Sequence, residues 1–257
     1  MVSTRSHPGK VSDSTDTPAK TTPNKRQTRS KDSSEPSSPT TALATRSRAR
    51  SVSAWSHTPS TLTLVWLIVS LPLVIWDTGY VLLRPWSMPG GKLHAPIWSP
   101  YKLYGTVDYV YGFPAYEAKD GFTGAQGTVN ALETLLYMVY LGIAYYYGNQ
   151  ESGVSGRGAP ATLLGRRKIV GREASLAVLI GFATSIMTLS KTLLYWLNEY
   201  HSGFAHIGHN DFVSLLFLWI IPNGAWILFP TYMTYVFGSE IFQGLEMAAG
   251  LPPKKFL

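Results

Sequence analysis

Four residues whose side chains can transfer protons, donate hydrogen bonds or face a cation lie within long apolar stretches: Asp77, Glu133, Asn223 and Trp226. An ionisable side chain in hydrocarbon is costly, so it usually faces the interior of a helix bundle and marks a site. A carboxyl group in an apolar pocket can hold and donate a proton near neutral pH, and an aromatic face can stabilise a cation. These residue types predict proton-transfer chemistry or ligand binding inside a membrane.

The elements that would position these groups are four apolar windows, each long enough to cross a bilayer as a helix: 60–83, 128–148, 174–197 and 212–237. A hydrocarbon core about 30 Å thick needs roughly 20 mostly apolar helical residues, and we find no fifth window of this kind. The sequence therefore predicts an all-α membrane protein, a four-transmembrane-helix bundle spanning 59–245. Within it, Asn223 and Trp226 are three residues apart and share one helix face.

Residues 1–58 form a different class of sequence, rich in Ser, Thr, Pro, Lys and Arg. They hold ten Lys and Arg against four Asp and Glu, so most of the net charge of +7 lies there. Because this segment has too little apolar surface to offset the entropy of ordering, we expect a disordered tail. Its basic run at 46–50 precedes the first window and is expected to set orientation and touch anionic lipid rather than bind nucleic acid.

Three basic regions predict the orientation: the tail, the segment 155–173 and the C-terminal residues 246–257. With four spans they lie on one side, which the positive-inside rule assigns to the cytosol. The loop 84–127, dense in Trp, Tyr, Pro and Gly, then faces the lumen, where we expect it to fold against the bundle as a lid. The last four residues, KKFL, resemble a cytosolic di-lysine retrieval signal and suggest the endoplasmic reticulum.

The remaining polar residues of the windows have simpler expected roles. We expect Lys191 to extend its ammonium towards the lumenal interface, with pairing to Asp77 or Glu133 as the alternative. The hydroxyls of the third window fit helix packing. Three histidines form a lumenal group without a supporting carboxylate pattern, so no metal site is predicted there: His201, His206 and His209.

Several function classes have no support in the sequence. Cysteine is absent, which removes disulfides, thiolate metal ligands and cysteine nucleophiles. No glycine-rich phosphate loop and no serine elbow is present, so nucleotide hydrolysis and serine hydrolase chemistry are not predicted. We expect no cofactor.

Two stretches of the chain resemble the EXPERA-domain family, the four-helix fold of the emopamil-binding protein (the sterol Δ8-Δ7 isomerase), the sigma-2 receptor and the transmembrane-6 superfamily. The later stretch contains Leu194-Tyr195-Trp196-Leu197-Asn198-Glu199, Gly203-Phe204-Ala205-His206, Gly208-His209 and Asn223-Gly224-Ala225-Trp226-Ile227-Leu228-Phe229-Pro230. The earlier one has Asp77, Trp98-Ser99-Pro100-Tyr101, Asp108 and Glu133 in the family's order. Together they cover about 60 to 250.

The resemblance implies a site for a sterol or other lipid. It assigns catalytic roles to Asp77, Glu133, Asn223 and Trp226, and substrate-binding roles to Asp108, Trp98, Tyr101 and Tyr195. Two positions depart from the isomerase pattern: Leu73 stands where the family isomerase has a histidine, and Leu136 where it has a threonine. The resemblance also leaves homodimerisation open.

Three hypotheses follow. The first is a sterol Δ8-Δ7 isomerase of the endoplasmic reticulum, in which Glu133 and Asp77 exchange protons with the substrate and Trp226 faces the cation. The second is a non-catalytic binder of sterols or other lipids, acting in transport or regulation, that uses the same pocket. The third is a structural membrane scaffold whose polar residues only hold the helices together.

Overall fold

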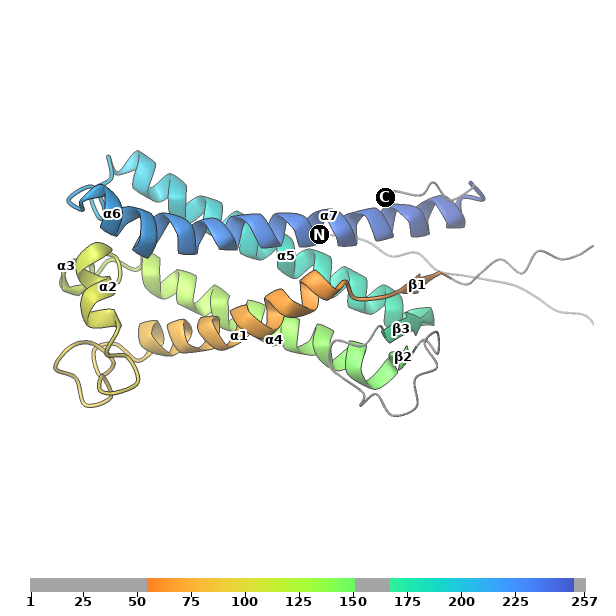
Figure 1. The fold of residues 1–257 in the computed structure, drawn as a ribbon, viewed down its shortest axis with the longest axis horizontal. Coiled ribbons are helices and arrows are strands. Elements are labelled where there is room, and N and C mark those ends of the chain that lie inside the picture. The colour runs from red at the N-terminus through yellow and green to blue at the C-terminus, as the bar shows by residue number, and fades with distance from the viewer. Residues whose placement is uncertain (1–54, 151–166, 252–257) are drawn as a thin grey trace, which may run out of the picture. The chain divides into compact units, whose positions relative to one another are not determined.

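The computed structural model describes residues 55–150 and 167–251. Most of the predicted N-terminal tail, much of the basic segment 155–173 and the last six residues lie outside these ranges. Four long helices lie side by side (Figure 1): α1 (Thr61–Leu82), α4 (Phe122–Tyr147), α5 (Gly171–His201) and α7 (Ile221–Ala248). Helix α7 is continuous with a short helix and a π-helical turn that precede it: α6 (Phe212–Leu215) and η1 (Leu216–Ile220).

Within residues 55–150 and 167–251, four helices are long and apolar enough to cross a membrane, in agreement with the predicted number and approximate positions of the spans: Thr61–Leu82, Phe122–Tyr147, Gly171–His201 and Phe212–Ala248. Their ends differ from the predicted windows. Helix α4 begins at Phe122 because its first turns are held by tertiary contacts that hydropathy does not register. The Thr123 hydroxyl donates to the Val110 carbonyl at 2.7 Å, and Gly127 packs against Val81. Helix α7 continues to Ala248, beyond the predicted domain end at 245.

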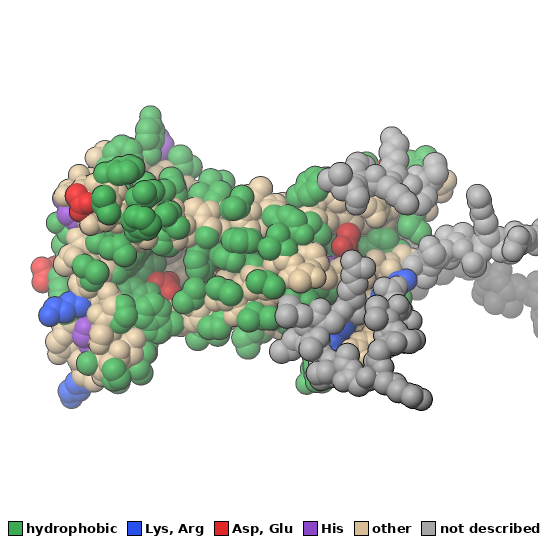
Figure 2. Space-filling view, in the orientation of Figure 1, with side chains coloured by type: hydrophobic (Ala, Val, Ile, Leu, Met, Phe, Trp, Pro, Cys, Tyr) green, Lys and Arg blue, Asp and Glu red, His purple; other side chains and the backbone are tan. Residues whose placement is uncertain are grey.

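The helices expose apolar side chains and bury polar ones. Val69, Leu179 and Leu228 are more than half exposed, whereas Thr184 and Ser185 are fully buried. Figure 2 shows hydrophobic side chains over most of the middle of one face, with most charged and histidine side chains towards its two ends. This pattern is the reverse of a water-soluble bundle and fits a domain surrounded by lipid.

One end of the bundle carries a small antiparallel sheet, which the all-α prediction did not include. Its strands are β1 (Ser56–His57), β2 (Asn149–Gln150) and β3 (Arg167–Val170), in the order β1-β3-β2. The register pairs Ser56 with Val170 and Asn149 with Lys168. We call this the sheet end.

The residues just before α1 are packed into the sheet end, so the predicted tail boundary at 58 is too late. His57 is 1% exposed; its Nδ1 lies 2.6 Å from Glu240 Oε2 and its Nε2 lies 3.0 Å from the Tyr140 hydroxyl. The Trp55 indole donates to the Glu240 carbonyl at 3.2 Å. These contacts connect the start of the described chain to α4 and α7.

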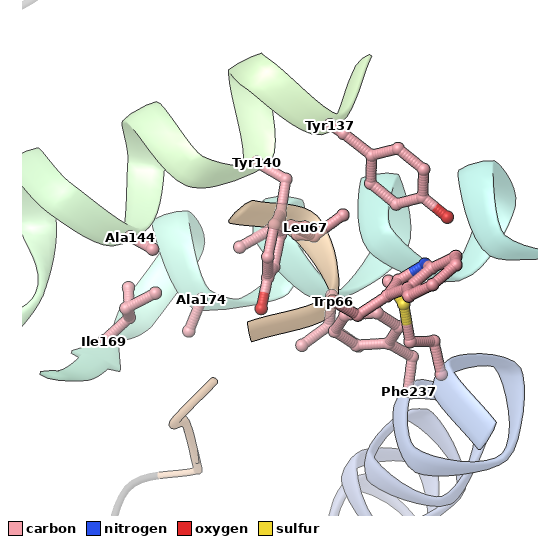
Figure 3. Close-up of a cluster of buried hydrophobic side chains, with 11 residues drawn as sticks. Trp66, Leu67, Tyr137, Tyr140, Ala144, Ile169, Ala174 and Phe237 are labelled. Carbon is pink, nitrogen blue, oxygen red and sulfur yellow. The ribbon is translucent and has the colours of Figure 1, made fainter. Parts of the chain in front are cut away.

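The main hydrophobic core lies between the four long helices on the sheet-end side (Figure 3). Figure 3 shows side chains from α1, α4, α5, α7 and β3 gathering there, among them Trp66, Tyr140, Ile169 and Phe237. The Trp66 ring stacks on Phe229 with centroids 4.3 Å apart. Because aromatic rings bury large areas, this cluster accounts for much of the packing that joins the helices.

The opposite end, which we call the loop end, is formed by the segment between α1 and α4 and by the α5–α6 connection. It contains two short helices, α2 (Tyr101–Val107) and α3 (Phe113–Glu117). Their aromatic side chains pack against α1: the Tyr101 ring stacks on Tyr80 at 3.8 Å between centroids. Trp98 fits against Gly79, where an added Cβ would lie 3.0 Å from the indole.

We expect Gly181→Ala to destabilise the bundle by about 1–3 kcal/mol, because overpacking a buried contact forces side chains and backbone to move. A Cβ at Gly181 would lie 2.6 Å from the Phe237 ring, and Phe237 is 1% exposed. The matched control is Gly142→Ala, where the added Cβ meets nothing within 4 Å. This control should be neutral or gain up to about 1 kcal/mol from helix propensity.

The measurement is the free energy of unfolding in mixed micelles, titrated with a denaturing detergent and followed by circular dichroism. Equal stability of the two variants would show that α5 and α7 do not pack at this position as described.

Candidate functional site

A cavity of about 490 Å³ opens between α1, α4, α5, α2 and the η1–α7 junction. Most of its lining is apolar and aromatic: Leu73, Val74, Trp76, Pro100, Tyr101, Leu103, Tyr104, Tyr111, Tyr195, Phe217, Leu218, Pro222 and Trp226. Its polar lining residues are Asp77, Thr123, Gln126, Asn130, Lys191, Thr192 and Asn223. Its volume and mixed lining are typical of a small-molecule site.

Five of the eight residues expected at the site line this cavity: Asp77, Tyr101, Tyr195, Asn223 and Trp226. The other three do not belong to the lining: Glu133, Asp108 and Trp98. Leu73, the position that departs from the family histidine, is also in the lining. The cavity therefore brings together one of the two expected acids with the amide and the indole.

Asp77 is held by three hydrogen-bond donors. Its Oδ1 accepts from the Tyr101 hydroxyl at 2.5 Å, and its Oδ2 accepts from Asn130 Nδ2 at 3.1 Å and from the Tyr111 hydroxyl at 3.4 Å. Burial, reinforced by the nearby Asp77 charge, raises the pKa of the Tyr101 hydroxyl, so this group remains a donor at neutral pH. These three donors hold the carboxyl group in place at the wall of the cavity.

Glu133 lies outside the cavity lining and contacts Lys191, which belongs to the lining. The Lys191 Nζ is 3.1 Å from Glu133 Oε2, and Thr188 donates to the same oxygen at 3.0 Å. The other oxygen, Oε1, is buried and has no hydrogen-bond partner among the described residues. The expectation that Lys191 extends to the interface is therefore wrong, because its ammonium is turned inward and paired with a buried acid.

Asn130 joins the two acidic positions into one network. Its Oδ1 accepts a hydrogen bond from the Lys191 ammonium, while its Nδ2 donates to Asp77. The polar chain therefore runs from Asp77 on α1 through Asn130 on α4 to Lys191 on α5, and back to Glu133 on α4. A buried amide suits this position because it offers an acceptor to the cation and donors to the carboxylate.

Asp108 forms a second buried acidic position beside the cavity. It is fully buried and accepts from the Val110 N–H at 3.1 Å, from the Trp219 indole at 3.1 Å and from the Tyr195 hydroxyl. Burial raises the pKa of Asp108 to about 6, and the hydrogen bonds from Tyr195 and the Val110 N–H oppose that shift. Tyr195 connects Asp108 to the cavity, since it also lines it.

The expected amide and indole come from the junction of η1 and α7. Asn223 Nδ2 donates to the Trp219 carbonyl at 2.9 Å, so the side chain is tied to the π-helical turn four residues earlier. Trp226 meets Trp66 edge-on, with centroids 5.0 Å apart. π-Helical turns inside α-helices are frequent at functional sites. The extra residue in such a turn changes the direction in which the neighbouring side chains point.

Trp98 and the histidines of the loop end have structural contacts. The Trp98 indole donates to the Trp76 carbonyl at 2.9 Å. His206 Nδ1 lies 2.7 Å from the buried Glu199, and His209 Nε2 lies 2.7 Å from the Thr106 carbonyl. Among the residues that the structure describes, no group of three or more His, Cys, Asp or Glu is arranged to hold a metal ion.

Four lining residues had no assigned role in the sequence-based interpretation: Asn130, Gln126, Tyr104 and Tyr111. Lys191 was expected at the interface, with pairing to Asp77 or Glu133 as the alternative, and was not assigned to the site. The signal for Asn130 was its place one helical turn before Glu133, and for Lys191 its position within an apolar window. No sequence signal distinguished Tyr104 and Tyr111 from the other aromatic residues of the loop.

Comparison of the chain with protein-family models, with curated proteins and with solved structures found no match. The family resemblance therefore rests on the quoted residues alone. Chemically, the cavity offers an acid that accepts three hydrogen bonds, a buried cation and an aromatic wall, which together suit an amphipathic ligand.

The Lys191–Glu133 pair should show strong non-additivity. We expect Lys191→Met to destabilise the protein by about 3–5 kcal/mol, because it leaves a buried carboxylate without its cation. The double variant Glu133→Gln/Lys191→Met should recover most of that loss, since residue 133 no longer carries a carboxylate that needs the cation. Unfolding in mixed micelles measures both, with Lys102→Met at an exposed position as the charge-matched control. Additive losses would mean that the two side chains do not interact.

The stability of the loop end should depend on the ionisation of Asp108. Its folded pKa of about 6 lies above the ordinary 3.8 of an unfolded aspartate, so the folded state takes up a proton first as the pH falls. Between pH 7 and pH 5 the wild type should therefore gain about 1 kcal/mol relative to Asp108→Asn. Unfolding free energies of both proteins at the two pH values measure this difference. A relative loss in the wild type on acidification would contradict it.

Proposed function

We propose that this chain is an EXPERA-like membrane protein that binds a sterol or a similar amphipathic lipid in the cavity beside Asp77. The observation that carries the proposal is the cavity itself, which lies among the membrane-spanning helices and combines an apolar, aromatic wall with a small polar group. A rigid apolar body with one polar end matches such a lining. The role is binding, in lipid transport or in regulation by lipid.

Binding without turnover is favoured over isomerisation by the position of Glu133. Sterol isomerisation needs one group that delivers a proton and another that removes one, and both must reach the substrate. Asp77 lines the cavity, whereas Glu133 lies outside the lining and is paired with Lys191. Leu73 adds to this argument, because it cannot supply the proton that a histidine would.

Isomerase activity is the second candidate, and one observation favours it. Asp77, Asn223 and Trp226 line the same cavity, so three of the four residues to which the resemblance assigns catalysis are together. In that case Asp77 would exchange the proton and the Trp226 ring would face the developing cation.

We further propose that the protein resides in the endoplasmic reticulum with both termini in the cytosol. This orientation is supported by the basic composition of the tail, the 155–173 segment and the C-terminus. It would place the loop end on the lumenal side and the sheet end on the cytosolic side.

Saturable binding of a radiolabelled Δ8 sterol to purified protein in phosphatidylcholine nanodiscs tests the proposal. Trp226→Ala should weaken binding at least about tenfold, since it removes a large aromatic wall of the cavity. The matched control is Trp86→Ala, because Trp86 is 56% exposed and lies outside the lining. Thermal unfolding of each variant separates lost binding from lost folding.

Analysis of the same incubations for the Δ7 product distinguishes the candidates. Binding without product supports the binder, whereas conversion that disappears in Asp77→Asn would establish the isomerase. Absence of saturable binding by folded wild-type protein would reject both. If Asp77→Asn and Glu133→Gln then each unfolded the bundle, the scaffold hypothesis would stand in their place.

A further inference from the structure

Two hydrogen-bond donors that line the cavity have no acceptor among the described residues. An ammonium group carries three N–H donors. Lys191 directs its ammonium to Asn130 Oδ1 and Glu133 Oε2, and within the described part of the chain the third donor has no acceptor. The indole N–H of Trp226 likewise has no acceptor there. Both residues line the cavity.

The two carboxyl groups near these donors already have hydrogen-bond or ion-pair partners within the protein. Asp77 accepts from Tyr101, Tyr111 and Asn130. The second carboxylate, Glu133, is covered by Lys191 and lies outside the lining. A ligand that brought another donor to Asp77 would compete with these three donors.

We propose that Lys191 selects the head group of the ligand, and that the cavity takes an amphipathic lipid ending in an oxygen acceptor, a hydroxyl or a ketone, in preference to an amine. This inference rests on the proposed function, because it specifies the ligand of the same cavity. The oxygen accepts the free N–H of Lys191, forming a charge-assisted hydrogen bond in a water-poor site.

An ammonium head group is disfavoured by the same residue. Two cations within a few ångströms repel each other far more strongly in a buried site than in water, because the effective dielectric constant is lower. The side chain of Lys191 is only 13% exposed, so water screens its charge poorly. Its position in the lining puts it within reach of whatever occupies the polar end.

Three probes that share one sterol ring system test this inference: a 3-hydroxy sterol, the corresponding 3-ketone and the corresponding 3-amine. Each competes at pH 7, where the amine is protonated, against the radiolabelled 3-hydroxy sterol on protein in phosphatidylcholine nanodiscs. For the wild type we expect the hydroxyl and ketone probes to bind at least about tenfold more tightly than the amine. Lys102→Met, which removes an exposed charge outside the cavity, should keep this ranking.

The decisive protein is Glu133→Gln/Lys191→Met, which removes the cation together with the carboxylate that it contacts. Its preference for oxygen over amine should fall to about threefold or less. An amine that binds the wild type as tightly as the hydroxyl probe, or a ranking unchanged in the double variant, would overturn the inference while leaving the proposed function intact. Failure of all three probes to bind the folded wild type would overturn the proposed function, and this inference with it.

Discussion

A single buried ammonium determines how three of the four long helices can pack. Lys191 on α5 needs a carboxylate within contact distance, because an unpaired charge is very costly in the membrane interior. Glu133 on α4 supplies it at 3.1 Å, and Asn130 carries the polar contact onward to Asp77 on α1. These contacts set the rotation and the axial register of α1, α4 and α5 together. Apolar packing alone leaves more freedom, since lipid chains compete with side chains for the same contacts.

The two ends of the domain differ in how the space between the helices is filled. Towards the sheet end, Trp66, Tyr140 and Phe237 fill the space between the helices. Towards the loop end, the helices leave a cavity, and the polar chain lies along its wall. The π-helical turn before α7 and Pro222 fall at the cavity rather than in the core. The π-helical departure from regular α-helix therefore lies beside the cavity.

The sequence predicted the four spans well because apolar length is what a bilayer requires, and composition records it directly. It missed the first turns of α4, where Thr123 and Gly127 are fixed by the loop and by α1 rather than by lipid. It also missed the packing of His57, whose partners lie more than 80 residues away. The sequence could not predict that Lys191 lines the cavity while Glu133 does not. This depends on how each helix is rotated about its axis, and the apolar residues of the windows do not specify that rotation.

The continuous helix from Phe212 to Ala248 has 37 residues, so at 1.5 Å per residue it is about 55 Å long. A bilayer core is only about 30 Å thick, and a tilt of the usual size does not absorb the difference. The helix must therefore project from the hydrocarbon, and the acidic residues Glu240 and Glu246 mark its sheet end as the projecting part. The His57–Glu240 contact then belongs to the headgroup region, in a far more polar medium than the Lys191–Glu133 pair. These two acid–base contacts thus lie on opposite sides of a dielectric boundary, and the Glu240 side chain is 20% exposed whereas Glu133 is 4% exposed.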